Sequence, residues 1–205
     1  ATAVLRVNKH GRRYSDEGFG THILAALEGA HQPNGDLWAV FDDTIREQIT
    51  FQTPCHGLLD YTDADEMKRF ETSLEKAEAQ KNRLVLDQDR AGESRPLFCA
   101  DTLEELATLM FEEEADRNNF LNEVNRYNML CQKGHDDDFG KDPRLMQPVA
   151  KAPFYASGTI KDSHAPGGQS LKILVTVSGL EIDSNQQVLD RDFEPIPGLY
   201  ATGNC

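Results

Sequence analysis

Residues 101–134 restrict the fold more than any other stretch, because their apolar residues recur at helical spacing through two successive segments. Asp101, with Glu104 three residues further on, is close to a capping box and predicts the start of the first helix. Gly134 predicts the end of the second helix. The two apolar stripes are Leu103, Leu106, Ala107 and Met110, then Phe120, Val124, Tyr127 and Cys131. Two amphipathic helices with a short join predict a helical hairpin.

The chain before this hairpin mixes short β-prone runs with polar helical stretches. Residues 3–7 are β-prone, and the turn-forming residues 8–11 let residues 12–14 return as a second strand, which predicts a β-hairpin. The other predicted elements are a short helix at 23–27, a turn at 33–35, a buried strand at 37–41 with a helix-start signal at Asp42 and Asp43, and a helix at 63–84.

After the helical hairpin, Pro143, Pro148 and Pro153 break helical structure and force an extended path. Residues 157–170 are rich in Gly, Pro and Ser and predict a loop. Short strands are expected at 171–177, 180–183, 187–189 and 199–201. The order of strands, helices and strands predicts an α+β fold class.

The composition is that of a globular protein. Of 205 residues, 39% are hydrophobic and 27% are charged, and 21 Lys and Arg against 35 Asp and Glu give a net charge of −14. The acidic balance argues against a nucleic-acid partner, because a phosphate backbone attracts clustered Lys and Arg. No apolar run approaches the roughly 20 residues that a membrane span needs.

Several kinds of site are excluded by local motifs. The 4 cysteines form no CxxC pair and the 6 histidines show no HxxxH or HExxH spacing, so no metal site is expected. The aspartates at 136–138 fail the calcium-loop pattern and are interpreted as a solvated loop. The sequence contains neither GxGxxG nor GxxxxGK[ST], so it offers no nucleotide-phosphate motif.

Both ends of the sequence have the character of cuts within a larger protein. The chain starts at Ala1 without Met and without a signal-peptide pattern. It stops at Gly203-Asn204-Cys205, directly after the apolar run 198–202. We therefore expect an excised piece of a longer chain, with its compartment, bacterial cytoplasm or exported, left open.

A set of short phrases, spread in order over most of the chain, carries a family resemblance. The phrases are VNKHGRRYSDE at 7–17, LWAVFDDTI at 37–45, DTLEELA at 101–107, NRYN at 125–128, GHDDDFGK at 134–141, APFYA at 152–156, GLEID at 179–183, QVLD at 187–190 and IPGLYATG at 196–203. Together they resemble the fumarate reductase/succinate dehydrogenase-like FAD-dependent oxidoreductases, which are flavoproteins.

The resemblance implies a placement within that family. Residues 1–150 resemble the capping, substrate-binding domain, and residues 151–205 resemble a truncated return into the FAD-binding domain. The family's GxGxxG unit, which takes the ADP half of FAD, is not in this sequence. Because FAD needs that helix N-terminus for its pyrophosphate, we expect FAD in the full-length protein and no cofactor on the isolated chain.

The resemblance also implies where a catalytic acid would lie. In the family's fumarate reductases a proton-donating Arg follows the glutamate of the NE motif, the motif acid, by four positions. The matching glutamate here is Glu17, so that position is Thr21, with His22 beside it. A family histidine before the LxID strand is replaced by Val175. An enzyme that reduces fumarate needs cationic groups to hold the two carboxylates of the substrate and an acid to protonate its carbon. We therefore expect a less charged substrate, such as an enone or steroid-like ring, with His22 as a substitute acid or as a solvated helix-start histidine.

The remaining site residues come from the same resemblance. Glu17 matches the motif acid, which implies a place at the substrate pocket; its alternative is a structural partner of Arg12 or Arg13. Thr176 would join Val175 at that pocket. The expected cofactor contacts are Ser178 and Gly179 beside the flavin ring, and Gly203 and Asn204 near the ribityl chain.

Two functions of different class follow. The first is a fragment, inactive by itself, of an FAD-dependent oxidoreductase that moves a hydride between the flavin and a C=C/C–C unit. Its partners would be a small-molecule substrate, the remainder of the FAD-binding domain and an electron-donor protein. The second is a free-standing, non-catalytic module that binds a small molecule or a protein. A longer reading frame with GxGxxG upstream would distinguish the first from the second.

Overall fold

The computed structural model describes residues 4–19, 28–29, 31–33, 36–49, 61–88, 94–159 and 179–202. The chain divides into two compact units, residues 1–172 and residues 173–205, and each is described by itself. The predicted helix at 23–27 and the predicted strand at 171–177 lie outside the described residues. The division into domains at residue 150 stays a prediction about the whole protein.

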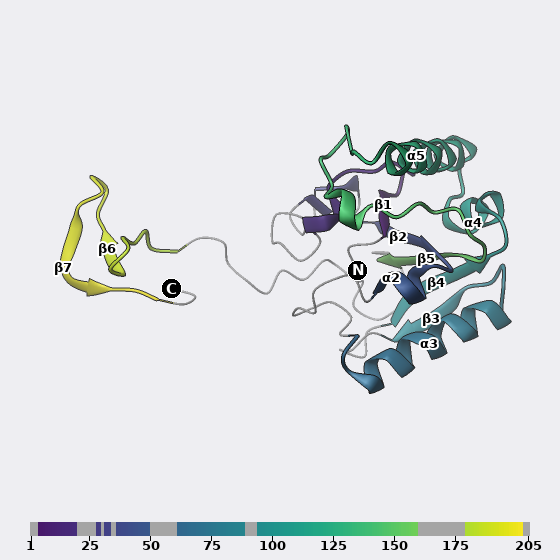
Figure 1. The fold of residues 1–205 in the computed structure, drawn as a ribbon, viewed down its shortest axis with the longest axis horizontal. Coiled ribbons are helices and arrows are strands. Elements are labelled where there is room, and N and C mark those ends of the chain that lie inside the picture. Colours follow the sequence, from purple (N-terminus) through teal and green to yellow (C-terminus); the bar gives the residue numbers. More distant parts are fainter. Residues whose placement is uncertain are drawn as a thin grey trace. The chain divides into compact units, whose positions relative to one another are not determined.

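The first unit is built on a five-stranded sheet in which every neighbouring pair is antiparallel (Figure 1). The spatial order is β1-β2-β5-β4-β3, so the last strand in sequence lies in the middle. The strands are β1 (Leu5–Asn8), β2 (Leu37–Asp42), β3 (Val85–Gln88), β4 (Ser94–Ala100) and β5 (Phe154–Thr159). This antiparallel sheet with separate helices confirms the α+β class.

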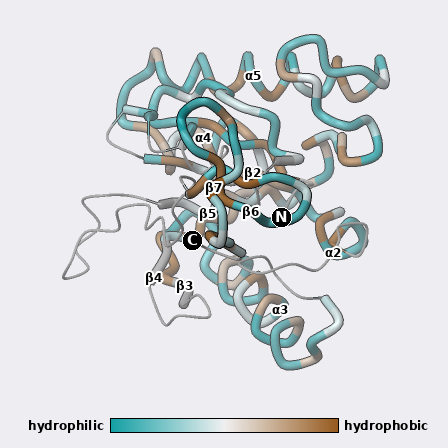
Figure 2. The backbone as a smooth tube through the Cα atoms, turned by 90° about the vertical axis from the view of Figure 1, so that its left-hand side faces the viewer, coloured by the Kyte–Doolittle hydropathy of each residue, from teal (hydrophilic) through white to brown (hydrophobic). Residues whose placement is uncertain are grey.

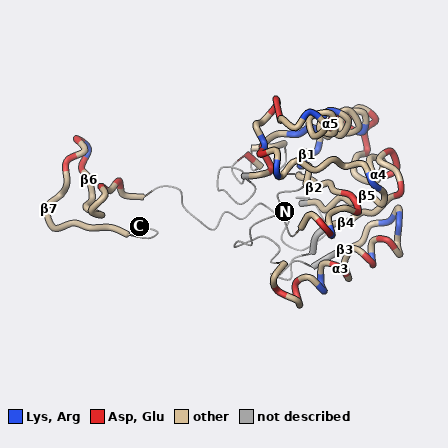
Figure 3. The backbone as a smooth tube through the Cα atoms, in the orientation of Figure 1, with Lys and Arg blue, Asp and Glu red and all other residues tan. Residues whose placement is uncertain are grey.

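Helices cover both faces of the sheet, with α3 on one side and α4 and α5 on the other (Figure 1). The helical elements are η1 (Glu17–Phe19), α2 (Ile45–Gln48), α3 (Ala64–Ala79), α4 (Leu103–Met110), α5 (Glu114–Lys133) and η4 (Pro143–Leu145). Figure 2 shows that α3 and α5 carry hydrophilic residues interspersed with hydrophobic ones, and Figure 3 shows charges of both signs along them. This is the pattern of helices with one face in solvent.

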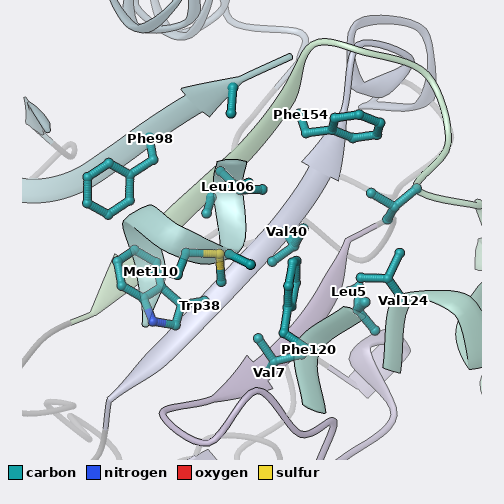
Figure 4. Packing of buried hydrophobic residues seen from close by; sticks show 14 of the residues in the cluster. Leu5, Val7, Trp38, Val40, Phe98, Leu106, Met110, Phe120, Val124 and Phe154 are labelled. Carbon is teal, nitrogen blue, oxygen red and sulfur yellow. The ribbon is translucent and has the colours of Figure 1, made fainter. Parts of the chain in front are cut away.

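The period-2 alternation of the strands separates the two cores. Trp38 and Val40 of β2 point toward α4 and α5, whereas Phe41 belongs to the cluster on the α3 side. β5 divides in the same way, with Phe154 on the first side and Tyr155 on the second. Figure 4 shows the first cluster, in which Leu106, Met110, Phe120 and Val124 meet Leu5, Val7, Trp38, Val40, Phe98 and Phe154.

The absence of a side chain at Gly158 leaves room for the ring of Trp38 on the neighbouring strand. The two residues are directly opposite in the β2–β5 pair, and a Cβ at Gly158 would lie 2.5 Å from the Trp38 ring. We expect Gly158→Ala to lower the free energy of unfolding by about 1–3 kcal/mol, because the ring must leave its position. Urea denaturation measures this loss, with Ser157→Ala, the preceding strand position, as the control. Equal stability of the two variants would contradict the close approach.

Several predicted elements are confirmed, with shifted ends. α4 and α5 form the predicted hairpin, and α5 ends at Gly134, which has a φ of 73°. The helix predicted at 63–84 is α3, which ends at Ala79. The cap at Asp101 was wrong by one residue. Thr102 accepts from the backbone N–H of Glu105, whose side chain accepts in return from the Thr102 N–H.

Other predictions were wrong. Residues 12–14 form no second strand; Arg13 makes an isolated bridge to Val7, and the ladder partner of β1 is β2. Residues 157–159 belong to β5 and not to a loop. Pro143 begins the short helix η4 in place of an extended path. Strands β3 and β4 were not predicted, although the apolar run at 97–100 is their signal.

The second unit is a small antiparallel meander in its described part, residues 179–202. β6 (Gln187–Leu189) pairs with β7 (Pro195–Tyr200), and Ile182 bridges to Val188. Among these residues only Val188 is buried. The strands predicted at 180–183, 187–189 and 199–201 correspond to the bridge, to β6 and to the end of β7.

Candidate functional site

Four charged side chains are buried together in the first unit. Arg13 and Glu17 come from the segment after β1, and Asp136 and Lys141 come from the loop after α5. Their side chains have relative exposures of 0–2%. We call these four residues the charge cluster. Its two cations and two anions balance, which is the condition under which charges remain stable away from water.

Arg13 lies at the centre of the cluster and bonds to both carboxylates. Its Nε and Nη2 donate to the two oxygens of Glu17, both at 2.9 Å. Its Nη1 and Nη2 donate to the two oxygens of Asp136 at 3.0 and 2.8 Å. The guanidinium also lies 5.0 Å from the ring centres of Tyr127 and of Phe139. The planar fork of arginine is the group that can serve two carboxylates at once.

Lys141 holds the other side of Glu17. Its Nζ lies 3.2 Å from Glu17 Oε2 and donates to the Val4 carbonyl at 3.0 Å and to the Tyr127 hydroxyl at 2.9 Å. The backbone N–H of Arg6 donates to Glu17 Oε1 at 3.2 Å. The Glu17 carboxylate is therefore held by β1, by Arg13 and by the loop after α5.

Asp136 organises its own loop. The interpretation of residues 136–138 as solvated is wrong for Asp136 and holds for Asp137 and Asp138, which are exposed. Asp136 is buried, and its carboxylate accepts from the backbone N–H groups of Asp138, Phe139 and Lys141. The two neighbouring aspartates are also paired, Asp137 with Lys133 and Asp138 with Arg126. Each carboxylate of the run has its own cation, so the run is a loop fastened to α5.

Burial and pairing shift the pKa values of the cluster in opposite directions. Burial alone would raise the pKa of Glu17, but the charge of Lys141 and the hydrogen bonds from Arg13 lower it below its usual range. For Asp136, burial is likewise outweighed by Arg13 and by the backbone N–H of Lys141, and the pKa is lowered to about 2. Burial lowers the pKa of Lys141 despite the charge of Glu17.

The low pKa of Asp136 predicts a loss of stability in acid. A folded-state pKa of about 2 against an ordinary 3.8 means that ionised Asp136 stabilises the fold above about pH 4 and loses this contribution as the pH falls toward 2. We expect Asp136→Asn to be the less stable protein near neutral pH, by at least about 1 kcal/mol, and to differ less from the wild type near pH 2. Thermal melts over that range test this; a constant difference would contradict it.

Local structure explains how the sequence brings Arg13 to the cluster. The Asn8 side chain accepts from the N–H groups of His10 and Arg12 and so closes the turn after β1. Gly11 has a φ of 68°, and a Cβ there would lie 2.4 Å from the Asp116 carbonyl oxygen of α5. The turn therefore packs directly on α5, and Arg13 enters the protein beside Tyr127.

The cluster is suited to holding structure in place and not to reacting. Glu17 and Asp136 accept several hydrogen bonds each, and Lys141 donates three. Side chains whose hydrogen-bonding groups are all paired fix the orientation of the backbone segments that carry them. Glu17 begins η1 and, in the sequence, precedes Thr21 by four residues.

Most of the predicted site residues lie outside the described part of the chain. These are Thr21, His22, Val175, Thr176, Ser178, Gly203 and Asn204. Gly179 is described and exposed at the start of the second unit's meander. Glu17 is paired with Arg13, which is the structural role considered for it, while its place at a substrate pocket stays a prediction. Asp136 and Lys141 were missed, because only the fold brings them to Glu17.

The chain matches the family model described as FAD binding domain over residues 2–205. It belongs to that family. As an FAD-binding-domain protein it is similar to proteins that are named as oxidoreductases. The family model covers residues of both units under the single description FAD binding domain, so the match does not distinguish a capping domain from the rest of the chain.

The named relatives of this FAD-binding-domain chain are reductases, dehydrogenases and other oxidoreductases. It is 28% identical over 204 residues to vinyl phenol reductase of Lactiplantibacillus plantarum, covering 98% of this chain and 36% of that protein. It is 28% identical over 197 residues to NADH:acrylate oxidoreductase of Vibrio harveyi, covering 96% and 15%. A flavocytochrome c3 fumarate reductase in its open conformation aligns over 99% of this chain and 27% of its own, at 22% identity and a TM-score of 0.47. The chain thus spans about a third or less of these proteins.

The described residues do not fit the pyrophosphate of FAD. A pyrophosphate site is a helix N-terminus with free backbone N–H groups and positive potential. The first turns of α3, α4 and α5 instead carry acidic residues, among them Asp65, Glu104 and Glu114.

Within the described ranges, no group of three His, Cys, Asp or Glu side chains could hold a metal ion. No helix there is long and apolar enough to cross a membrane.

Proposed function

We propose that the chain is the capping domain, residues 1–150, and part of the FAD-binding domain, residues 151–205, of a longer FAD-dependent oxidoreductase. The observation that carries the proposal is the family match over residues 2–205, together with coverage of only 36% of vinyl phenol reductase. The α+β unit around a five-stranded sheet is compatible with a substrate-binding cap. FAD would supply the redox chemistry of the intact protein.

The proposed reaction is reduction of a C=C bond, or its reverse, in a substrate other than fumarate. Vinyl phenol and acrylate, named in two relatives, both contain such a bond. Thr21 and Val175 replace the Arg and His that the resemblance expects around fumarate. A dicarboxylate would miss these cations, whereas a phenol or an enone would not need them.

The chain's own residues would bind and position the substrate. His22 would hold the proton that a reduced carbon takes up, with Thr21 beside it, and Glu17 with Val175 and Thr176 would border the pocket. Ser178, Gly179, Gly203 and Asn204 would approach the flavin in the full-length protein only. An electron-donor protein and the remainder of the FAD-binding domain would complete the enzyme.

The experiment is to express the full-length gene product and record its flavin spectrum. Vinyl phenols, acrylate, enones and fumarate are then offered to the reduced flavin, and its reoxidation is followed. We expect turnover of an alkene with at most one carboxylate. Fumarate turnover at ordinary enzymatic rates would refute the interpretation of Thr21 and Val175.

The 205-residue chain purified alone is the matched control. The acidic first turns of α3, α4 and α5 support the expectation that it binds negligible FAD. A yellow protein with a flavin absorption band would contradict the expectation that the isolated chain is inactive and cofactor-free.

A further inference from the structure

The antiparallel meander of the second unit, formed by β6, β7 and the segment before β6, gathers apolar side chains on one face (Figure 1). Ile182 lies directly opposite Val188, and directly opposite residues of neighbouring strands share a face. The Leu189 N–H donates to the Glu181 carbonyl, so the same register continues one residue toward the N-terminus. Because side chains alternate along an extended segment, Leu180 lies on the face of Ile182.

Strand β7 adds Ile196 and Leu199 to this face. Tyr200 pairs with Gln187, which precedes Val188 and therefore lies on the opposite face. Leu199, next to Tyr200, alternates back to the face of Val188, and the pair at the other end of β7 places Ile196 there in the same way. We call this surface the meander face; it consists of Leu180, Ile182, Val188, Ile196 and Leu199.

The meander face is largely exposed to solvent. The side chains of Leu180, Ile182 and Leu199 are 55, 42 and 43% exposed, and among the described residues 179–202 only Val188 is buried. A ribbon of a few short strands is marginally stable in water unless its apolar face packs against another element. An exposed apolar face of this kind therefore indicates an interaction surface.

Charge and size indicate what kind of partner covers this face. Residues 179–202 contain one cation, Arg191, and five carboxylates, those of Glu181, Asp183, Asp190, Asp192 and Glu194. The whole chain carries a net charge of −14, so a second copy of it would bring like charge to an acidic surface. A stable dimer interface also uses about 20–30 residues a side, far more than the meander face offers. Both observations favour a tethered partner with Lys and Arg around an apolar patch.

We propose that the meander face docks on the remainder of the FAD-binding domain, outside these 205 residues, through an apolar patch bordered by Lys and Arg. This inference rests on the proposed function, in which the chain is part of a longer oxidoreductase. The match to the FAD binding domain extends through the meander, while the chain covers only 36% of vinyl phenol reductase. Layers of one domain bury their apolar faces against each other, and a covalently linked partner needs a smaller contact than a separate molecule.

The first experiment identifies the partner by photo-crosslinking in the full-length protein. The photoreactive residue p-benzoylphenylalanine replaces Ile182 on the meander face or, as the matched control, Gln187 on the opposite face. Crosslinked peptides are identified by mass spectrometry. We expect position 182 to crosslink within its own polypeptide to a segment outside residues 1–205 that contains Lys or Arg, and position 187 not to reach that segment.

The second experiment measures amide hydrogen exchange of β6 and β7 in the same full-length protein. Ile182→Glu places on the meander face a carboxylate that an apolar contact cannot pair, and we expect exchange at least about tenfold faster than in the wild type. Gln187→Glu adds the same charge on the opposite face and is expected within about threefold of the wild type. Leu199→Ala adds no charge, which keeps the test available if Ile182→Glu does not fold, and is expected to accelerate exchange by about threefold or more.

Three results would overturn the inference. One is that position 182 forms no crosslink to a segment outside residues 1–205, whether it reacts instead with the first unit, with a second copy or with nothing. Another is that positions 182 and 187 crosslink equally to one segment. The last is wild-type exchange of β6 and β7 in both Ile182→Glu and Leu199→Ala.

Flavin content and alkene turnover are measured separately, so the two proposals can fail independently. A full-length protein without flavin or turnover, whose position 182 still crosslinks outside residues 1–205, refutes the proposed function and supports the docking. A flavin-containing reductase whose position 182 crosslinks to the first unit or to a second copy refutes the docking alone.

Discussion

Arg13→Met is expected to lower the free energy of unfolding of the 205-residue chain by about 3–5 kcal/mol. The substitution keeps an unbranched apolar side chain of similar length next to Tyr127 and Phe139, but it leaves Glu17 and Asp136 buried with one cation between them. An uncompensated buried carboxylate is the source of the penalty. Urea denaturation monitored by circular dichroism gives the difference.

Arg12→Met is the matched control for this change. Arg12 is the preceding residue, its side chain is 60% exposed, and its nearest carboxylate, that of Glu123, lies 3.8 Å away. We expect a loss below about 1 kcal/mol. In acid, the carboxylates of the Arg13→Met protein can protonate, so its deficit is expected to shrink. Equal losses from the two arginines would show that the cluster does not stabilise the fold.

Phe120→Ala is expected to lower the free energy of unfolding by about 3–5 kcal/mol. Phe120 is fully buried on α5 and lies in the cluster between that helix and the sheet (Figure 4). Its ring centre is 5.7 Å from that of Phe111, and a Cβ at Gly11 would lie 2.7 Å from its backbone nitrogen. The alanine would leave a cavity that α5 cannot close, because Gly11 already touches the helix.

Met129→Ala, on the same helix, is the control for the loss of side-chain volume. Met129 is 56% exposed, so its truncation is expected to change stability by less than about 0.5 kcal/mol. Both variants are compared by urea midpoints at a common m-value. A loss below about 1 kcal/mol from Phe120→Ala would contradict the packing of α5 on the sheet.

Local patterns predicted the parts of the fold that depend on local physics. The apolar stripes of α4 and α5 and the glycine at 134 follow from helix geometry, and they were confirmed. The run at 37–41 was recognised as a strand because buried strands are short and continuous in apolar residues. The cap was displaced by one residue, since Asp101 and Thr102 are both good caps and only the structure decides between them.

Pairings between distant residues could not be predicted from one sequence. Arg13 and Asp136 are 123 residues apart, and nothing local indicates that Asp136, of three aspartates in a row, is the buried one. Lys141 is likewise an ordinary polar residue until the fold places it under Tyr127. Strand β4 was hidden by Pro96, which sits opposite Leu86 of β3, beyond the part of β4 that pairs with β5.

The middle position of β5 has a consequence for synthesis on the ribosome. β1 with β2 and β3 with β4 are made early, as two separate ribbons, but neither has its inner neighbour until residues 154–159 have emerged. Until then β2 and β4 each present an unpaired row of backbone N–H and C=O groups, the feature that promotes association with other chains. The sheet can therefore be completed only after its last strand has emerged. If the ribosome stalls before residue 154, β2 and β4 are left as unpaired edges, whereas in the finished unit both strands pair with β5.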